Sequence, residues 1–237
     1  MKNIKWVSFC ASNKVLKTVI HFFPKVLNVA TQYPVICKLG LFGEGKDAGT
    51  VMVDGVRINQ ASGILLDTAF PSLNGDYAGF IGLSIEFSLR QQSPNFEKLS
   101  SLIELVSFSS STHFYPTLVS EEEKKRAFLK SFPVLFDTLS EPSLLLVNST
   151  LTEFRTNVLN VENTLVVENL QSLPLTAKEY TLDGLDNFND KSSVFNSCWT
   201  NGYLSLLRFD SEIPAGVGVY ILCRDKLTRK ITSCFSL

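Results

Sequence analysis

Residues 40–50, GLFGEGKDAGT, are the stretch of this chain that comes nearest to a catalytic motif. They follow the phosphate-binding pattern G-x-x-x-x-G-K-[ST] from Gly40 to Lys46, but Asp47 stands where a Ser or Thr would hold magnesium. A phosphate loop also needs a helix after it, because the amides at the helix amino terminus bind the anion. The following residues alternate like a strand and turn at Asp54-Gly55. We therefore predict a glycine-rich hairpin here, and no cofactor.

A second polar stretch, DGLDNFNDKS at 183–192, carries oxygen donors of the kind that calcium prefers. Phe188 falls where the EF-hand spacing requires a ligand, and Asp and Asn favour turns by bonding to their own backbone. We interpret this stretch as a plain loop and predict no metal site.

Residues for acid–base or nucleophilic catalysis are few. The chain has two histidines, His21 and His113, which leave little for a His-rich metal site or a catalytic triad. Gly82-x-Ser84 begins like a nucleophile elbow, but Glu86 replaces its second glycine within a regular strand pattern. We name no catalytic residue, although pairs of Asp and Glu could still meet in space as they do in glycosidases.

Composition places the chain among folded proteins. Its 237 residues are 45% hydrophobic and 19% charged, and its net charge of −1 offers no electrostatic argument for a nucleic-acid partner. No apolar run approaches the ~18 residues of a membrane span. We expect a cytoplasmic protein, because a convincing signal peptide is absent and the five cysteines include no C-x-x-C pair. Its first 43 residues hold six lysines and no acid, which suits an interaction or membrane-facing segment.

The dominant hydrophobic period is two, which predicts an all-β fold. Residues 80–90 place Leu83, Ile85 and Phe87 on one face and serines and a glutamate on the other. Polar turn clusters separate such segments at intervals of about ten residues, as in sandwiches and barrels. Residues 50–58 are predicted as a hairpin around Asp54-Gly55, and further strands at 33–39, 64–69, 102–108, 113–119, 143–148, 151–159, 163–170, 178–183, 193–197, 203–209, 215–224 and 230–236.

Two segments follow the helical period instead. Residues 14–23 place Lys14, Lys17 and His21 on one arc and apolar side chains, including Phe22 and Phe23, on the other. These five residues are our candidate face for a partner or a membrane surface; the alternative is a helix that packs over a sandwich with its lysines in water.

The second helical segment, residues 120–133, begins with a capping box at Ser120 and Glu123 and ends at Pro133. A linker-like DTLSEPS follows it.

We predict two β-sandwich-like domains at 1–119 and 143–237, joined by a helix and linker at 120–142, with one large barrel or sandwich as the rival. A faint similarity between residues 36–55 and 165–184 raises the hypothesis of a distant internal duplication.

These observations favour a non-enzymatic interaction or assembly module that acts through protein surfaces, as a structural subunit of a larger complex. Protein partners or self-association would then dominate, and the C-terminal strand at 230–236 would be paired or offer an edge for docking. The alternatives are a carbohydrate-binding sandwich, with Trp6, Trp199 or Tyr203 as stacking residues, and a hydrolase with carboxylates in the interdomain cleft.

Overall fold

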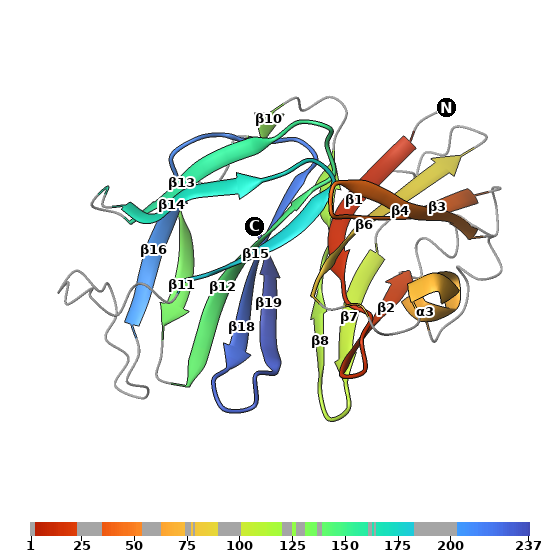
Figure 1. The fold of residues 1–237 in the computed structure, drawn as a ribbon, viewed down its shortest axis with the longest axis horizontal. Helices are drawn as coiled ribbons and strands as arrows, with labels where there is room; N and C mark the ends of the chain where they lie inside the picture. The colour runs from red at the N-terminus through yellow and green to blue at the C-terminus, as the bar shows by residue number, and fades with distance from the viewer. Residues whose placement is uncertain are drawn as a thin grey trace.

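The computed structural model describes residues 3–22, 35–53, 63–73, 77, 79–89, 101–119, 125–126, 131–136, 139–160, 163, 165–182 and 203–237. These residues form an all-β fold of four larger antiparallel sheets and one two-stranded sheet, as the period of two predicts (Figure 1).

The first half of the chain folds into two sheets. One has the order β4 (Lys46–Val53), β3 (Val35–Gly43), β6 (Ile81–Leu89), β1 (Asn3–Cys10) and β9 (Thr117–Val119). The other has the order β5 (Ile64–Leu65), β2 (Leu16–Phe22), β7 (Ser101–Ser107) and β8 (Ser111–Phe114). Short helical turns, α3 (Leu66–Ala69) and η1 (Pro71–Leu73), replace the end of the strand predicted at 64–69.

Aromatic side chains join the two sheets of the first half. Phe9 of β1 stacks on Phe114 of β8 with ring centroids 4.6 Å apart, and Phe22 of β2 meets Phe87 of β6 edge-on at 5.5 Å. Such contacts add to the free energy of burying the rings. The sheets therefore form a sandwich, with Phe87 on the inner face that the alternation predicted.

The second half adds two four-stranded sheets and a small one. One has the order β11 (Phe132–Phe136), β16 (Tyr203–Phe209), β13 (Phe154–Asn160) and β14 (Leu165–Ser172). The other, which we call the central sheet, has the order β15 (Thr176–Thr181), β12 (Ser140–Asn148), β18 (Val217–Asp225) and β19 (Ile231–Ser236). The small sheet pairs β10 (Lys125–Arg126) with β17 (Ile213–Pro214).

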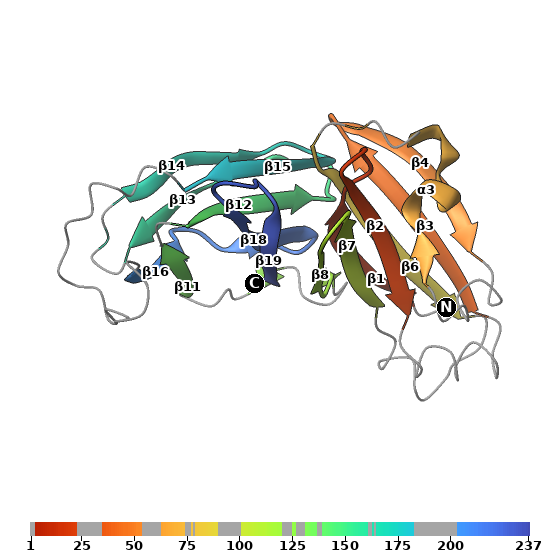
Figure 2. The same cartoon turned by 90° about the horizontal axis from the view of Figure 1, so that it is seen from below.

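The central sheet is buried on both faces. Leu144 and Leu146 of β12 belong to the core of the second half, whereas Leu145 and Val147 belong to the core that includes the first half. Strands buried on both sides are continuously apolar, which accounts for the runs SLLLV at 143–147 and VGVYIL at 217–222. The central sheet, whose strands all come from the second half, therefore contributes side chains to the cores of both halves (Figure 2).

Tyr220 of β18 lies at the centre of this junction. Its hydroxyl donates to the carbonyl of Val7, 2.6 Å away, and accepts from the backbone N–H of Thr117 at 3.1 Å. Its ring meets Phe9 and Phe114 edge-on at 5.0 and 5.6 Å. A side chain from the second half thus completes the core of the first.

The hairpin predicted at 40–50 is confirmed. β3 and β4 pair with each other around Glu44 and Gly45, whose φ values of 52° and 76° suit a tight hairpin turn. Gly40 lies inside β3 and pairs with Thr50, so the chain continues as a strand where a phosphate loop would continue as a helix. Asp54 and Gly55 lie outside the described residues.

The amphipathic helix predicted at 14–23 is wrong. Leu16–Phe22 is strand β2, which pairs with β7 along its whole length, and Phe23 lies outside the described residues. Ten residues are too few to separate a period of 3.6 from one of two, and the β-branched Val15, Thr18, Val19 and Ile20 favour a strand.

The interdomain helix predicted at 120–133 is also wrong where the chain is described. Lys125 and Arg126 form β10, and Phe132 begins β11. Lys125 and Arg126 pair instead with Pro214 and Ile213, far along the chain, so tertiary pairing decides over the local helical pattern. Residues 120–124 and 127–130 lie outside the described part.

The structure does not confirm the internal duplication. β3 and β4, from residues 36–55, form a hairpin in one sheet. The corresponding β14 and β15 lie in different sheets, where they pair with β13 and β12.

We predict that Tyr220→Phe lowers the free energy of unfolding by about 1–3 kcal/mol, because the buried Val7 carbonyl and Thr117 N–H lose a partner. Urea unfolding monitored by fluorescence measures this difference. Burial raises the pKa of Tyr220 from 10.0 to about 12, so the folded protein keeps the phenol proton over that range while the unfolded chain loses it.

The stabilisation by the neutral phenol is therefore complete below pH 10 and is lost as the pH rises through 12. The advantage of the wild type over Tyr220→Phe should shrink by about 1 kcal/mol for one pH unit above 10. The buried cysteines titrate in both proteins and cancel in this difference. An advantage that stays constant up to pH 11 would contradict the assignment.

Candidate functional site

Three connections meet at one end of the molecule, the lower edge of Figure 1: the turn at 11–15, which joins the two sheets of the first half, and the hairpin turns at 108–110 and 226–230. We call this the three-turn end. The first two turns are neighbours because β2 and β7 pair as far as Leu16 and Ser107. The third comes from the central sheet and is joined to the second by a hydrogen bond from Lys230 Nζ to Ser109 Oγ.

A cavity of about 450 Å³ opens between these turns. Both halves of the chain line it, with apolar and polar side chains. Its lining comprises Asn13, Val15, Leu16, Gly79, Phe80, Leu105, Ser107, Ser110, Thr112, Glu179, Arg224, Thr228, Arg229, Lys230 and Ile231.

Large apolar side chains are exposed around this cavity. Phe108 is 105% exposed, Leu227 87% and Val15 68%, one from each of the three turns. Leu139, 64% exposed, lies next to them because its carbonyl accepts a hydrogen bond from Lys226 N at 2.8 Å. Exposed apolar residues that gather at one place commonly mark a binding surface.

The charges of the three turns have one sign. The turns contain Lys14, Lys226, Arg229 and Lys230, all exposed, and no acidic residue. Neighbouring carboxylates form bonds of their own: Glu141 accepts from Arg229, and Asp67 from Ser12 and Lys17. The chain as a whole carries a net charge of −1, so the cationic end is a local property.

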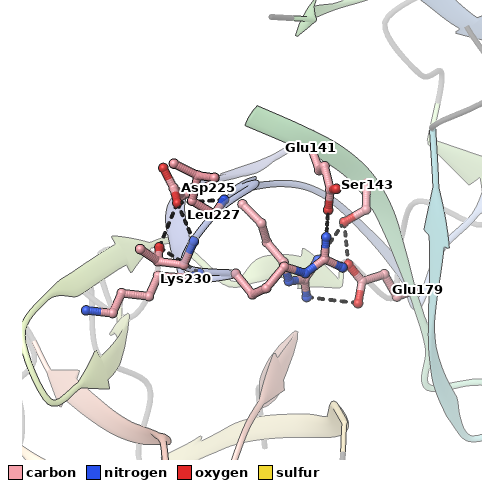
Figure 3. Close-up of polar contacts among 9 residues, drawn as sticks. Glu141, Ser143, Glu179, Asp225, Leu227 and Lys230 are labelled. Atoms are coloured by element: carbon pink, nitrogen blue, oxygen red, sulfur yellow. Dashed lines mark hydrogen bonds and ion pairs between the residues drawn. The ribbon is translucent and has the colours of Figure 1, made fainter. Parts of the chain in front are cut away.

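Asp225 is the acid nearest to the third turn, and its carboxylate is folded back into that turn. It accepts from the backbone N–H of Thr228 at 2.6 Å and of Leu227 at 3.1 Å, and from the Thr228 hydroxyl at 2.8 Å (Figure 3). These hydrogen bonds, chiefly those from Thr228, lower the pKa of Asp225. The turn therefore holds Leu227 outward on a well-bonded backbone.

An ion pair forms one wall of the cavity. Arg224 of β18 donates to both carboxylate oxygens of Glu179 in β15, with Nη2–Oε2 at 2.9 Å, and to Ser143 Oγ at 3.1 Å (Figure 3). The same guanidinium lies 5.6 Å from the ring centroid of Phe80, which belongs to the first half. Arg224 thus connects the central sheet to the first half through a cation–π contact.

Both histidines contact one carboxylate on the outer face of β2, β7 and β8. Glu104 accepts from His21 Nε2 at 2.7 Å and lies 3.4 Å from His113 Nε2. Burial raises the pKa of Glu104, but the hydrogen bond from His21, the charge of His113 and a bond from Ser111 outweigh it and lower the pKa. Within the described ranges, no three His, Cys, Asp or Glu are arranged to hold a metal ion.

The described residues of the candidate face at 14–23 lie on different surfaces, because residues 16–22 form strand β2. Lys14 lies in the first turn, at the three-turn end, whereas Lys17 pairs with Asp67 at 2.6 Å and His21 with Glu104. Phe22 packs inward on Phe87. The five residues therefore do not form one surface; Phe23 is not described.

The other sequence candidates do not assemble a site in the described part of the chain. Trp6 is 6% exposed and packs edge-on against Phe87, so it offers no stacking surface. Tyr203 begins β16, and Trp199 and the polar loop 183–192 lie outside the described residues. Ser84 lies within regular strand β6.

Sequence reasoning missed the residues of the three-turn end. Phe108 and Leu227 are single apolar residues inside polar turns, SFSSS and DKLTRK, and that contrast is the only local signal. Their proximity depends on sheet pairing between distant segments.

Comparison with protein-family models, with curated proteins and with solved structures finds no match for this chain. None of the helices in the described ranges has the length and apolar character needed to cross a membrane.

We predict that Glu104→Gln destabilises the protein by about 0.5–1 kcal/mol near pH 5, the range of partly exposed ion pairs, because His21 and His113 form ion pairs only when protonated. Because the pKa of Glu104 is lowered from 4.5 in the fold, its stabilisation is present above that pH and is lost as the pH falls through the folded value. Urea unfolding of both proteins between about pH 5 and 3 should show the difference vanish. A difference that grows over this range would contradict the prediction.

We also predict that Arg224→Met lowers the free energy of unfolding by about 2 kcal/mol, because it leaves the Glu179 carboxylate without its partner. The side chains of this pair are 17% and 25% exposed, so the effect is smaller than for a fully buried pair. Arg155→Met is the matched control: the side chains of Arg155 and its partner Glu153 are 64% and 37% exposed, so the loss of this pair should have a much smaller effect. Equal effects in urea unfolding would rule out a structural role for Arg224.

Proposed function

We propose that this protein is a non-enzymatic interaction module that binds its partner at the three-turn end. The observation that carries the proposal is the position of Phe108 and Leu227. They are the most exposed large apolar side chains in the described part of the chain, and each is the chain neighbour of a residue that lines the cavity, Ser107 and Thr228. The role of a structural subunit in a larger complex, and the cytoplasmic location, belong to the same proposal. Three buried free cysteines, Cys10, Cys37 and Cys234, support a reducing compartment.

The rival hydrolase is less favoured by the cavity. Its one lining carboxylate, Glu179, is bound to Arg224, whereas glycoside hydrolysis needs two carboxylates that face each other across the substrate. Of the three cations that line the same cavity, Arg224 is paired with Glu179 and Arg229 with Glu141, and Lys230 donates to Ser109, so the cavity suits a mixed polar–apolar ligand.

Binding of 8-anilinonaphthalene-1-sulfonate tests the proposal, because this probe combines an aromatic body with a sulfonate. We expect a fluorescence increase that saturates for the wild type and weakens at least about tenfold in Phe108→Ser/Leu227→Ser, since two apolar contacts are lost. Leu151→Ser is the matched control: Leu151 is 81% exposed in a different turn, and its replacement should leave binding unchanged.

Thermal unfolding should show that all three variants remain folded. Probe binding that is equal in the wild type and the double variant would place the binding surface elsewhere. Hydrolysis of chromogenic glycosides that is lost in Glu179→Gln would replace the proposal with the hydrolase.

A further inference from the structure

Resting on the proposed function, we propose that the partner of the three-turn end is an anionic membrane surface. Phe108, Leu227 and Val15 would enter the interface, while the cations of the same turns bind the headgroup phosphates.

The apolar part of this surface consists of convex tips. Phe108 stands on the β7–β8 turn of the first half and Leu227 on the β18–β19 turn of the second. Tyr220 and the bond from Lys230 to Ser109 hold these turns together, so the tips are presented as one unit. A bilayer interface deforms around separate tips, whereas a protein partner must supply a matching pocket for each. Interfacial anchors bury their apolar groups ~5–10 Å into the headgroup region.

The charge of the turns selects the kind of membrane. Lys14, Lys226, Arg229 and Lys230 belong to the turns that carry the tips, which contain no acid, and Arg229 is paired with Glu141. The carboxylate of Asp225, which ends β18, is bonded to the backbone of the third turn. Basic residues beside a membrane each contribute through attraction to anionic lipids, and the cytoplasmic leaflet is the anionic one. The charge complementarity therefore favours phosphatidylserine-like lipids over neutral phosphatidylcholine.

Co-sedimentation with vesicles tests this inference on the full chain. We expect binding to vesicles of phosphatidylcholine with phosphatidylserine, at least about tenfold weaker binding to phosphatidylcholine alone, and weakening by added salt. Phe108→Ser/Leu227→Ser should reduce binding at least about tenfold. Lys226→Gln/Lys230→Gln should reduce it about 25-fold, about fivefold for each lysine.

Two controls match these variants. Leu151→Ser removes an exposed apolar side chain from another turn. Lys38→Gln/Lys178→Gln removes two exposed lysines from strands β3 and β15, and so makes the same change in net charge as the lysine variant of the third turn. Both controls should bind vesicles as the wild type does.

Absence of binding to the anionic vesicles, or equal losses in the test and control variants, would overturn the inference. If the naphthalene sulfonate still binds at the three-turn end in that case, the proposed function stands and its partner is a protein. If light scattering then shows a mass increase that Phe108→Ser/Leu227→Ser abolishes, that partner is a second copy of this chain, and the membrane is again excluded.

Discussion

The double burial of the central sheet is the constraint on which the rest of the structure depends. β12 and β18 must present apolar side chains on both faces, because each face completes a different core. Tyr220 illustrates this constraint, because its ring packs among aromatic side chains of the first half. Its hydroxyl bonds to the Val7 carbonyl and the Thr117 N–H, two backbone groups that the close approach of the sheets removes from water. Side chains of the second half, such as Leu145 and Tyr220, therefore complete the core of the first half.

The central sheet also fixes the arrangement of the candidate site. Because β18 and β19 lie against the first half, their connecting turn is brought beside the turns that follow β1 and β7. Thr112 Oγ1 of β8 donates to the carbonyl of Ile231 in β19 at 3.3 Å, which ties the two elements next to the cavity. Both views show β8 and β19 side by side (Figures 1 and 2). The site thus needs no dedicated domain, since it arises where two sheet edges meet.

Much of the architecture could be predicted from local patterns. Alternation located β6, and the continuous runs at 143–147 and 217–222 marked strands, although their double burial became clear only in the structure. The two helices were mispredicted because short windows of β-branched or charged residues satisfy more than one period, and tertiary pairing decides between them. β1 was missed as a strand, because its lysines and the chain start suggested an interaction segment. The three-turn end could not be predicted, because it joins residues near positions 14, 108 and 227.

The bond between Tyr220 and Val7 spans 213 residues of sequence, which has a consequence for the order of folding. During synthesis the first half emerges long before β18, so the surface around Phe9 and Phe114 must wait for its covering aromatic side chain. The edge of β8 waits equally for β19. Contacts of this sequence separation make folding slow, and an uncovered apolar face with an open strand edge is prone to aggregation meanwhile. The first half therefore completes its core only once the central sheet has formed.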